Sequence, residues 1–288
     1  MKWRGRQGSR NIEDRRGSGG GRRRAGGGAA GGLGVGGVVV VLAIGYFLGI
    51  DVTPLLQGGG GQQTAGSTEI TQADEEAAQF VSVVLRDTEV MWDEVFESQL
   101  GRTYRPPTLV LYKGVTQSPC GDASGATGPF YCPADRKAYL DTAFFTTLSQ
   151  RLGAEGDFAV AYVVAHEVAH HVQNELGILV QANNARRQMS QADSNQVSVM
   201  IELQADCLSG IWARYARDRL GTVEPGDLQE AVNAARQIGD DTLQRNAGRR
   251  PNPHTFTHGT SKQRQRWFSR GYESGKVDQC DTFRARTL

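Results

Sequence analysis

The residues best suited to chemistry lie in one short stretch, His166-Glu167-Val168-Ala169-His170. Side chains four positions apart share one face of an α-helix, so His166 and His170 can hold a single Zn²⁺. Glu167 is then the general base that takes a proton from zinc-activated water. The stretch and the run before it are largely apolar, which predicts a buried helix. The alternative is a helix whose histidines bond to core carbonyls, but the motif favours zinc.

A catalytic zinc site needs a third protein ligand. The extended pattern H-E-x-x-H-x-x-G-x-x-H is excluded, because Gln173 and Leu176 stand at its glycine and last histidine. Downstream, Glu202 and Asp206 are again four apart, on an apolar helix rather than a solvated stripe. We therefore expect Glu202 to complete a His₂Glu site. Asp206 is placed to accept the free ring N–H of a ligand histidine, His166 in the first instance.

These two motifs together resemble the gluzincin layout of thermolysin-type enzymes. The wider sequence resembles the neutral zinc metallopeptidase family of single-pass bacterial membrane proteins. The segments that carry this resemblance, besides the zinc helix, are Lys2–Arg6, Asn11–Arg16, Gly128–Pro133, Glu202–Cys207 and His258–Phe283. The resemblance implies a membrane-anchored, zincin-like peptidase with one Zn²⁺ per chain that acts on peptide or protein substrates.

A donor to the oxyanion of the reaction is expected in addition, and His258 is the candidate. His258-Gly259, with Arg264 six residues after the histidine, faintly resembles the His-Pro-x-x-x-x-Arg element of another membrane-linked gluzincin family. Gly259 departs from that pattern, so a histidine that caps the last helix stays an alternative. His254 is a weaker substitute, and His171 points off the ligand face and is expected to be structural.

The elements that position these residues are predominantly α-helical. The sequence predicts an α+β zincin-like domain with a small antiparallel sheet, preceded by a transmembrane helix. A strand near residues 130–140 is expected to bind substrate as an added β-strand. The expected helices cover about 73–96, 157–176, 178–217 with a break near Ser190, 227–245, and a last helix capped at Thr260 or Ser261; the expected strands are 108–112 and 138–141.

Charge and glycine divide the chain into unlike parts. Residues 1–24 hold nine Lys or Arg against Glu13 and Asp14, and they contain few apolar residues. Residues 33–50 are apolar apart from glycine and at 1.5 Å per residue span ~27 Å, enough to cross a bilayer. The predicted parts are a disordered basic Gly/Arg-rich cytoplasmic head (1–30), a transmembrane helix (31–50), a flexible linker (51–72) and the metallopeptidase domain (73–288).

The basic head before the apolar span predicts a cytoplasmic N-terminus and an extracytoplasmic domain at the cytoplasmic membrane. A cleaved signal peptide competes with this prediction, but no small-x-small cleavage site follows closely. Gly32-x-x-x-Gly36 and Gly45-x-x-x-Gly49 would let two spans approach, which is compatible with a homo-oligomer in the lipid bilayer. The arginines also suggest a nucleic-acid arm, but the span argues against it and no nucleic acid is expected.

Four cysteines in an exported domain are most simply two disulfides. Cys120 with Cys132 would close a Gly-rich loop, which leaves Cys207 with Cys280. That second bond would tie the C-terminal part to the helix that carries Glu202. A cysteine-rich zinc site is the rival, although the chain contains no C-x-x-C pair.

The sequence thus favours a membrane-anchored zinc metallopeptidase. The alternative is a membrane-tethered, non-catalytic binding or chaperone-like module in which the metal is structural. A fourth protein ligand closing the metal would indicate that alternative, because catalytic zinc sites keep an open position.

Overall fold

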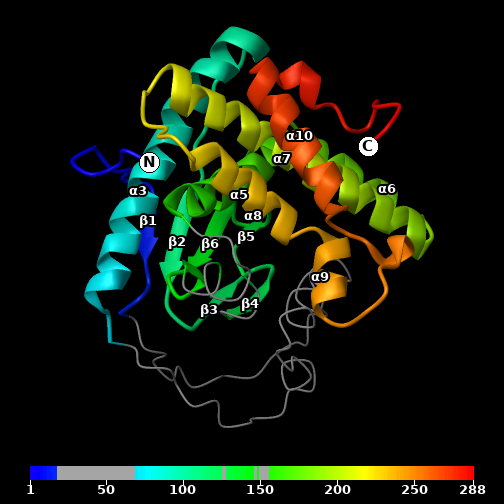
Figure 1. The fold of residues 1–288 in the computed structure, drawn as a ribbon, viewed down its shortest axis with the longest axis horizontal. Coiled ribbons are helices and arrows are strands. Elements are labelled where there is room, and N and C mark those ends of the chain that lie inside the picture. The colour runs from blue at the N-terminus through cyan, green and yellow to red at the C-terminus, as the bar shows by residue number, and fades with distance from the viewer. Residues whose placement is uncertain (18–68, 125–127, 146–147, 149–155) are drawn as a thin grey trace.

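The computed structural model describes residues 1–17, 69–124, 128–145, 148 and 156–288. Helices dominate, with a small sheet beneath them (Figure 1), so the α+β prediction is confirmed. The helices are α3 (Gln72–Val95), α5 (Asp157–Glu175), α6 (Ile178–Arg186), α7 (Gln191–Asp218), α8 (Asp227–Gln237), α9 (Asp240–Asn246) and α10 (Ser261–Ser274), with the short turns η1 (Phe96–Leu100), η2 (Pro253–Thr255) and η3 (Val277–Cys280). The strands are β1 (Ile12–Asp14), β2 (Thr108–Tyr112), β3 (Val115–Ser118), β4 (Gly121–Ser124), β5 (Phe130–Cys132) and β6 (Lys137–Asp141).

The main sheet is mixed, in the order β1-β2-β6-β5. β1 and β6 both run parallel to β2, and only β5 is antiparallel to its neighbour. The prediction of an antiparallel sheet is therefore wrong. The connection between β2 and β6 contains the β3–β4 hairpin and β5, so the chain returns to start β6 in the direction of β2, and parallel pairing needs such a long connection.

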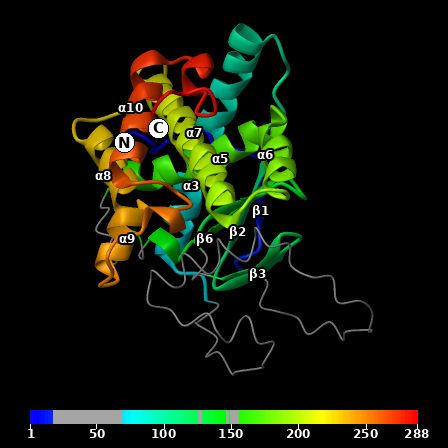
Figure 2. The ribbon, with the colours of Figure 1, turned by 90° about the vertical axis from the view of Figure 1, so that its right-hand side faces the viewer.

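The helices form a layer in which α5 is central. α5 packs against β5 and β6 on one side and against α3, α7 and α8 on others, and α7 lies along α10 (Figures 1 and 2). A Cβ added to Gly271 of α10 would lie 1.8 Å from the carbonyl oxygen of Cys207 in α7. The two helix backbones therefore touch, beside the disulfide that joins Cys207 to Cys280. The other predicted pair, Cys120 with Cys132, is also bonded.

Most predicted helix ends agree with the structure. Ser190 caps α7 and Thr260 begins α10 with a capping box. One prediction was wrong, because the helix expected over 227–245 is divided into α8 and α9. The division occurs at Gly239, which precedes α9. An added Cβ there would lie 2.4 Å from the amide nitrogen of Ser261, so a glycine is needed where the start of α10 packs against this turn.

The N-terminal prediction needs a larger correction. A disordered head over 1–30 was expected, but residues 1–17 pack on the domain, with Trp3 only 7% exposed and β1 in the sheet. The rest of the head, the predicted span 31–50 and the linker up to residue 68 lie outside the described residues. Among the residues that are described, no helix combines the length and the apolar character needed to cross a membrane.

Candidate metal centre

Helices α5 and α7 bring the three predicted ligands together. His166 Nε2 lies 3.1 Å from Glu202 Oε2, and His170 Nε2 lies 3.5 Å from Glu202 Oε1. One ligand atom from each residue falls within 4.8 Å of the other two. The imidazole rings are nearly perpendicular, with centroids 4.8 Å apart, as expected for two side chains on successive turns of one helix. The centre thus has the geometry of a three-residue cation site.

The outer ring nitrogens of the histidines face side chains that fix their orientation. His170 Nδ1 lies 2.8 Å from Gln173 Oε1, and the Gln173 amide donates in turn to the carbonyl of Ile201. His166 Nδ1 lies 3.1 Å from Asp206 Oδ1. Both Nε2 atoms consequently face Glu202 and suit metal binding. Asp206 takes the place that the sequence predicted, whereas Gln173 was missed, although its position three residues after His170 puts it on the same face.

Asp206 is itself held by two buried groups that the sequence did not assign to the site. Arg264 donates from Nε and Nη2 to the two carboxylate oxygens, at 2.8 and 2.9 Å, and is only 1% exposed. The Tyr162 hydroxyl donates to Asp206 Oδ1 at 2.5 Å. Burial tends to raise the pKa of Asp206, but Arg264 and His166 lower it overall. Asp206 is thus a fixed anion behind the His166 ring.

Glu167 points its carboxylate into the same buried region. Its Oε2 atom is buried and has no hydrogen-bond partner among the described residues. Burial raises the pKa of Glu167 to about 7, and the neighbouring Glu202 carboxylate adds to the rise while His166 opposes it. An unpartnered carboxyl group whose pKa is near neutrality suits a general base that gains and loses a proton during a reaction.

The centre fits zinc by its donor set and its charge. Two imidazoles and one carboxylate are the protein ligands of a common type of catalytic zinc site. Burial lowers the pKa of His166, but the carboxylates of Asp206 and Glu202 more than offset this and raise it to about 9. The site therefore favours positive charge. The His170 and Glu202 side chains stay 13% and 19% exposed, so the centre reaches the surface.

His258 lies near this centre and is held by Asp240, another residue that the sequence did not single out. Asp240 Oδ1 lies 3.1 Å from His258 Nδ1, while Asp240 Oδ2 accepts the backbone N–H groups of Thr257, His258 and Gly259. Burial lowers the pKa of His258, but the Asp240 carboxylate raises it overall, and Glu202 also contributes electrostatically. Gly259 has φ 90°, which proline cannot adopt, so this loop excludes the His-Pro pattern.

The remaining histidines lie elsewhere. His171 is buried, donates from Nε2 to the carbonyl of Arg105 and takes the Tyr131 hydroxyl at Nδ1. Burial lowers its pKa to about 4, so it is neutral near pH 7. His254 is exposed in η2. Neither histidine belongs to the group of three ligands.

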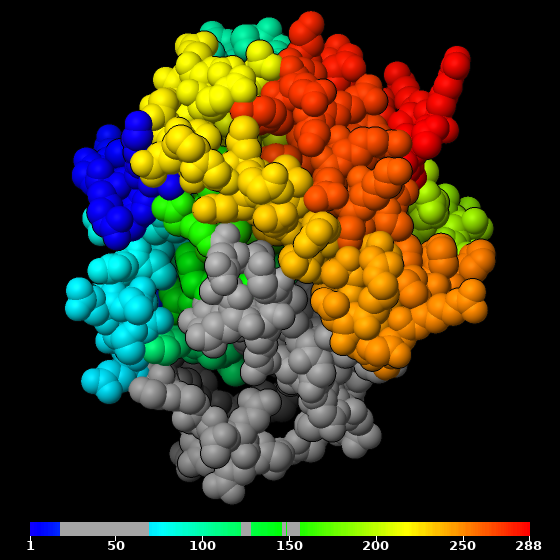
Figure 3. Space-filling view, viewed as in Figure 1, coloured from blue at the N-terminus to red at the C-terminus, as the bar shows by residue number. Residues whose placement is uncertain are grey.

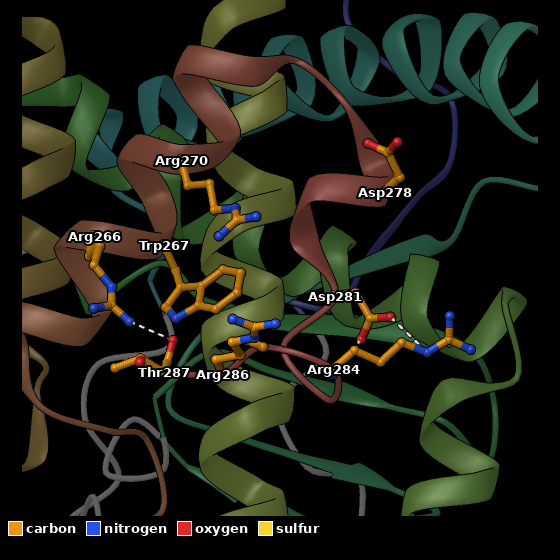
Figure 4. A pocket seen from close by; sticks show the side chains of 9 residues that line it. Arg266, Trp267, Arg270, Asp278, Asp281, Arg284, Arg286 and Thr287 are labelled. Carbon is orange, nitrogen blue, oxygen red and sulfur yellow. Dashed lines mark hydrogen bonds and ion pairs between the residues drawn. The ribbon is translucent and has the colours of Figure 1, made fainter.

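A hollow of about 700 Å³ lies away from the metal centre, between α10, η3 and the C-terminal residues (Figure 4). Its walls carry arginines from both sides, and Arg270 stacks over the ring of Trp267. Arg266 donates to the carbonyl of Thr287, and Arg284 pairs with Asp281. The Arg266 contact joins the C-terminal residues to α10, and none of the predicted site residues lines the hollow.

Comparison with known families agrees with this geometry. The model of the family described as "Putative neutral zinc metallopeptidase" matches residues 1–283. The chain belongs to this family. Because the match begins at residue 1, the neutral zinc metallopeptidase pattern includes the N-terminal segment as well as the helices of the metal centre. Membership implies zinc, and the group of His166, His170 and Glu202 provides the place for it.

One relative matches nearly the whole chain, and another matches about two thirds of it. It is 46% identical over 286 residues to "Uncharacterized protein YpfJ" of Escherichia coli strain K12, which is 98% of this chain and 99% of that protein. It is 45% identical over 195 residues to "Uncharacterized protein Rv2575" of Mycobacterium tuberculosis strain H37Rv, which is 64% of this chain and 65% of that protein. No solved structure matches the chain.

Proposed function

We propose that this neutral zinc metallopeptidase hydrolyses peptide bonds at the centre formed by α5 and α7. His166, His170 and Glu202 hold the metal in this proposal. Zinc, when bound there, supplies a Lewis acid that polarises the scissile carbonyl and makes water more acidic. Asp206 and Gln173 hold the two imidazoles in the orientation that presents their Nε2 atoms.

Glu167 moves the proton in the proposed reaction. Its buried Oε2 atom, which lacks a hydrogen-bond partner among the described residues, is the observation that carries the proposal. Burial raises its pKa to about 7, so the carboxylate can take a proton from water and then give it to the leaving amine. His258, oriented by Asp240, is the proposed donor to the oxyanion.

The decisive test compares two glutamates on the same helix. Glu167→Gln keeps the size of the side chain but removes the base, so cleavage of an unfolded protein should fall by roughly 10²- to 10⁴-fold. Zinc should stay near one per chain, because Glu167 is not a ligand. Glu175→Gln, eight residues further along α5, removes only the charge that pairs with Arg136, so it is the control and should keep wild-type activity and zinc.

The reverse results would reject the mechanism. Full activity in the zinc-loaded Glu167→Gln variant would remove Glu167 from the reaction. If the zinc-loaded wild-type chain cleaves no unfolded protein at all, the centre is better described as a structural metal site in a non-catalytic binding module.

Substrate is proposed to bind along β5. This strand lies at the edge of the sheet, and α5 packs beside it, so a peptide added there would run close to the metal centre. Edge strands offer unpaired backbone groups to an extended peptide. A crystal structure with a peptide inhibitor should contain main-chain hydrogen bonds to residues 130–132, and an inhibitor bound without them would refute this subsite.

The domain is proposed to work outside the cytoplasm, attached to the membrane through residues 31–50. Two disulfides support an oxidising compartment, because such bonds are rare in the cytoplasm. Cell fractionation should place the protein with the membranes, and release into the soluble fraction without detergent would contradict the attachment.

A further inference from the structure

The N-terminal segment Met1–Gly17 is built into the peptidase domain through its backbone. β1 pairs in parallel with β2, where the Leu109 amide donates to the Asn11 carbonyl and the Arg15 amide donates to the Leu111 carbonyl, at 2.8 and 2.7 Å. A further amide, that of Ser9, donates to the Ser82 carbonyl of α3 at 2.9 Å. The segment thus supplies an edge strand and continues along α3, on the surface visible in Figure 3.

Apolar packing and close approach accompany these bonds. Trp3 is buried and meets the Phe80 ring edge to face, with centroids 5.4 Å apart. Gly8 approaches α3 so closely that an added Cβ would lie 2.0 Å from Ser82 Oγ. The α-amino group of Met1 lies 2.7 Å from Asp157 Oδ1, at the first residue of the zinc helix. The segment therefore contacts the element that carries the metal ligands.

Polar side chains of the segment also bond to the domain. Arg6 donates to both carboxylate oxygens of Asp87, whose side chain is only 4% exposed. Ser9 and Asn11 both donate to Glu89 Oε1, at 2.5 and 2.7 Å. Arg6 therefore has a partner within the domain, whereas a basic head is usually explained by binding to lipid phosphates or nucleic acid.

The two chain ends on either side of residues 18–68 lie next to each other. Arg16 is buried and donates to the carbonyl of Asp74 in the first turn of α3, at 2.7 Å. It also pairs with Glu75 at 3.2 Å. Residue 17 and residue 69 flank this contact and therefore lie close together on the domain.

We infer that Met1–Gly17 is a permanent part of the peptidase domain and lies on the same side of the membrane as that domain. If the segment lay on the opposite side of the membrane from the domain, it could not pair with β2 as β1, and Arg6 could not reach Asp87. The inference replaces the cytoplasmic N-terminus that the positive-inside rule predicts for an extracytoplasmic domain. The inference is independent of zinc and of peptidase activity.

Cysteine labelling of the full-length protein in cells tests the inference. Arg10→Cys places a thiol on an exposed position of the segment, and Val180→Cys places one on α6, where the valine is 57% exposed. Each variant is treated with a maleimide that cannot cross membranes, before and after permeabilisation. The wild-type chain, whose four cysteines are disulfide-bonded, is the control for background.

Both thiols should react under the same condition. Labelling of both in intact cells supports the inference with the domain outside, and labelling of both only after permeabilisation supports it with the domain inside. Labelling of one thiol in intact cells and of the other only after permeabilisation would overturn it.

A thermal measurement on the purified protein tests the docking itself. Arg6→Ala leaves Asp87 without its partner, so the Tm should fall by at least about 4 °C. Arg10→Ala removes an exposed arginine of the same segment and should leave the Tm unchanged. Equal Tm values for the two variants would mean that the segment is not part of the folded unit, and would overturn the inference.

Discussion

Among the residues that the structure describes, two groups of three potential ligands occur, and one of the two has the features of a metal site. His166, His170 and Glu202 form one, and Asp157, Asp227 and Glu230 form the other; in both, the ligand atoms lie within 4.8 Å of one another. Proximity therefore does not distinguish them. The two groups differ in which partners the surrounding residues offer to their carboxylates and imidazoles.

The acidic group is satisfied from within the chain. The α-amino group of Met1 lies 2.7 Å from Asp157 and 3.4 Å from Asp227, and Glu230 accepts the backbone N–H of Phe158 at 3.1 Å. An ammonium and a helix N-terminus thus offset part of the negative charge of the three carboxylates. The comparison teaches that carboxylates close together can reflect a structural ion pair.

The metal centre differs in the groups that meet in it, which are two imidazoles and one carboxylate. Its imidazoles are oriented from behind by Asp206 and Gln173, so their free nitrogens converge on Glu202. Arg264 is committed to Asp206 and comes only within 4.0 Å of Glu202. A metal needs ligand nitrogens that point to one place in a fixed orientation, as those of His166 and His170 do, whereas an ion pair has no such need.

The largest effect, on zinc content, is expected when one carboxylate is removed from each group in turn. Glu202→Ala should abolish stoichiometric zinc binding and activity, since a catalytic site cannot hold its metal firmly on two histidines alone. Glu230→Ala should keep about one zinc per chain. Metal analysis of the two purified variants gives the answer. Equal zinc contents would mean that the two groups do not differ in the way described.

A smaller effect is expected from the support behind His166. Arg264→Lys keeps a positive charge but loses the fork that grips Asp206, so zinc affinity should fall by roughly 10- to 100-fold without unfolding. Competition with a chromogenic chelator measures this affinity. Arg266→Lys, on the exposed side of the same helix, is the control, and a matching loss of affinity there would contradict the assigned role.

The smallest effect is expected in the acidic group, where a substitution should change stability but not zinc content. Asp227→Asn removes one of the three carboxylates that face the Met1 ammonium, which keeps Asp157 and Glu224 as partners. The free energy of unfolding should therefore fall by only about 1 to 2 kcal/mol. Zinc content should not change. Asp93→Asn on exposed α3 surface should change neither quantity. Urea unfolding measures the difference, and a loss of zinc from the Asp227 variant would contradict the division into two groups.

The sequence predicted which residues come together in the candidate metal centre, because helical spacing places residues four apart on one face. Glu202 and Asp206 followed from donor chemistry on an apolar helix. Asp240 and Arg264 could not be found in that way, since each reaches the site from an element whose position depends on tertiary packing. Tyr162 was missed although it lies four residues before His166 on α5, so the same spacing puts it on that face.

The sheet and the N-terminal segment were harder to predict for a different reason. β1 is three residues, Ile12–Asp14, two of them acidic, and its stability comes from pairing with Leu109–Leu111 rather than from its own propensity. A glycine- and arginine-rich composition predicts disorder only when no partner surface exists. The parallel direction of β2 and β6 depends on the path of the connection between them, which composition does not reveal.

The most direct test of the metal centre is the X-ray absorption spectrum of the purified, zinc-loaded chain at the zinc edge. The account predicts two imidazoles and remaining oxygen neighbours at about 2.0 to 2.2 Å, with no sulfur shell near about 2.3 Å. A sulfur shell, or three or more imidazoles, would place the zinc elsewhere in the chain and contradict the centre built on His166, His170 and Glu202.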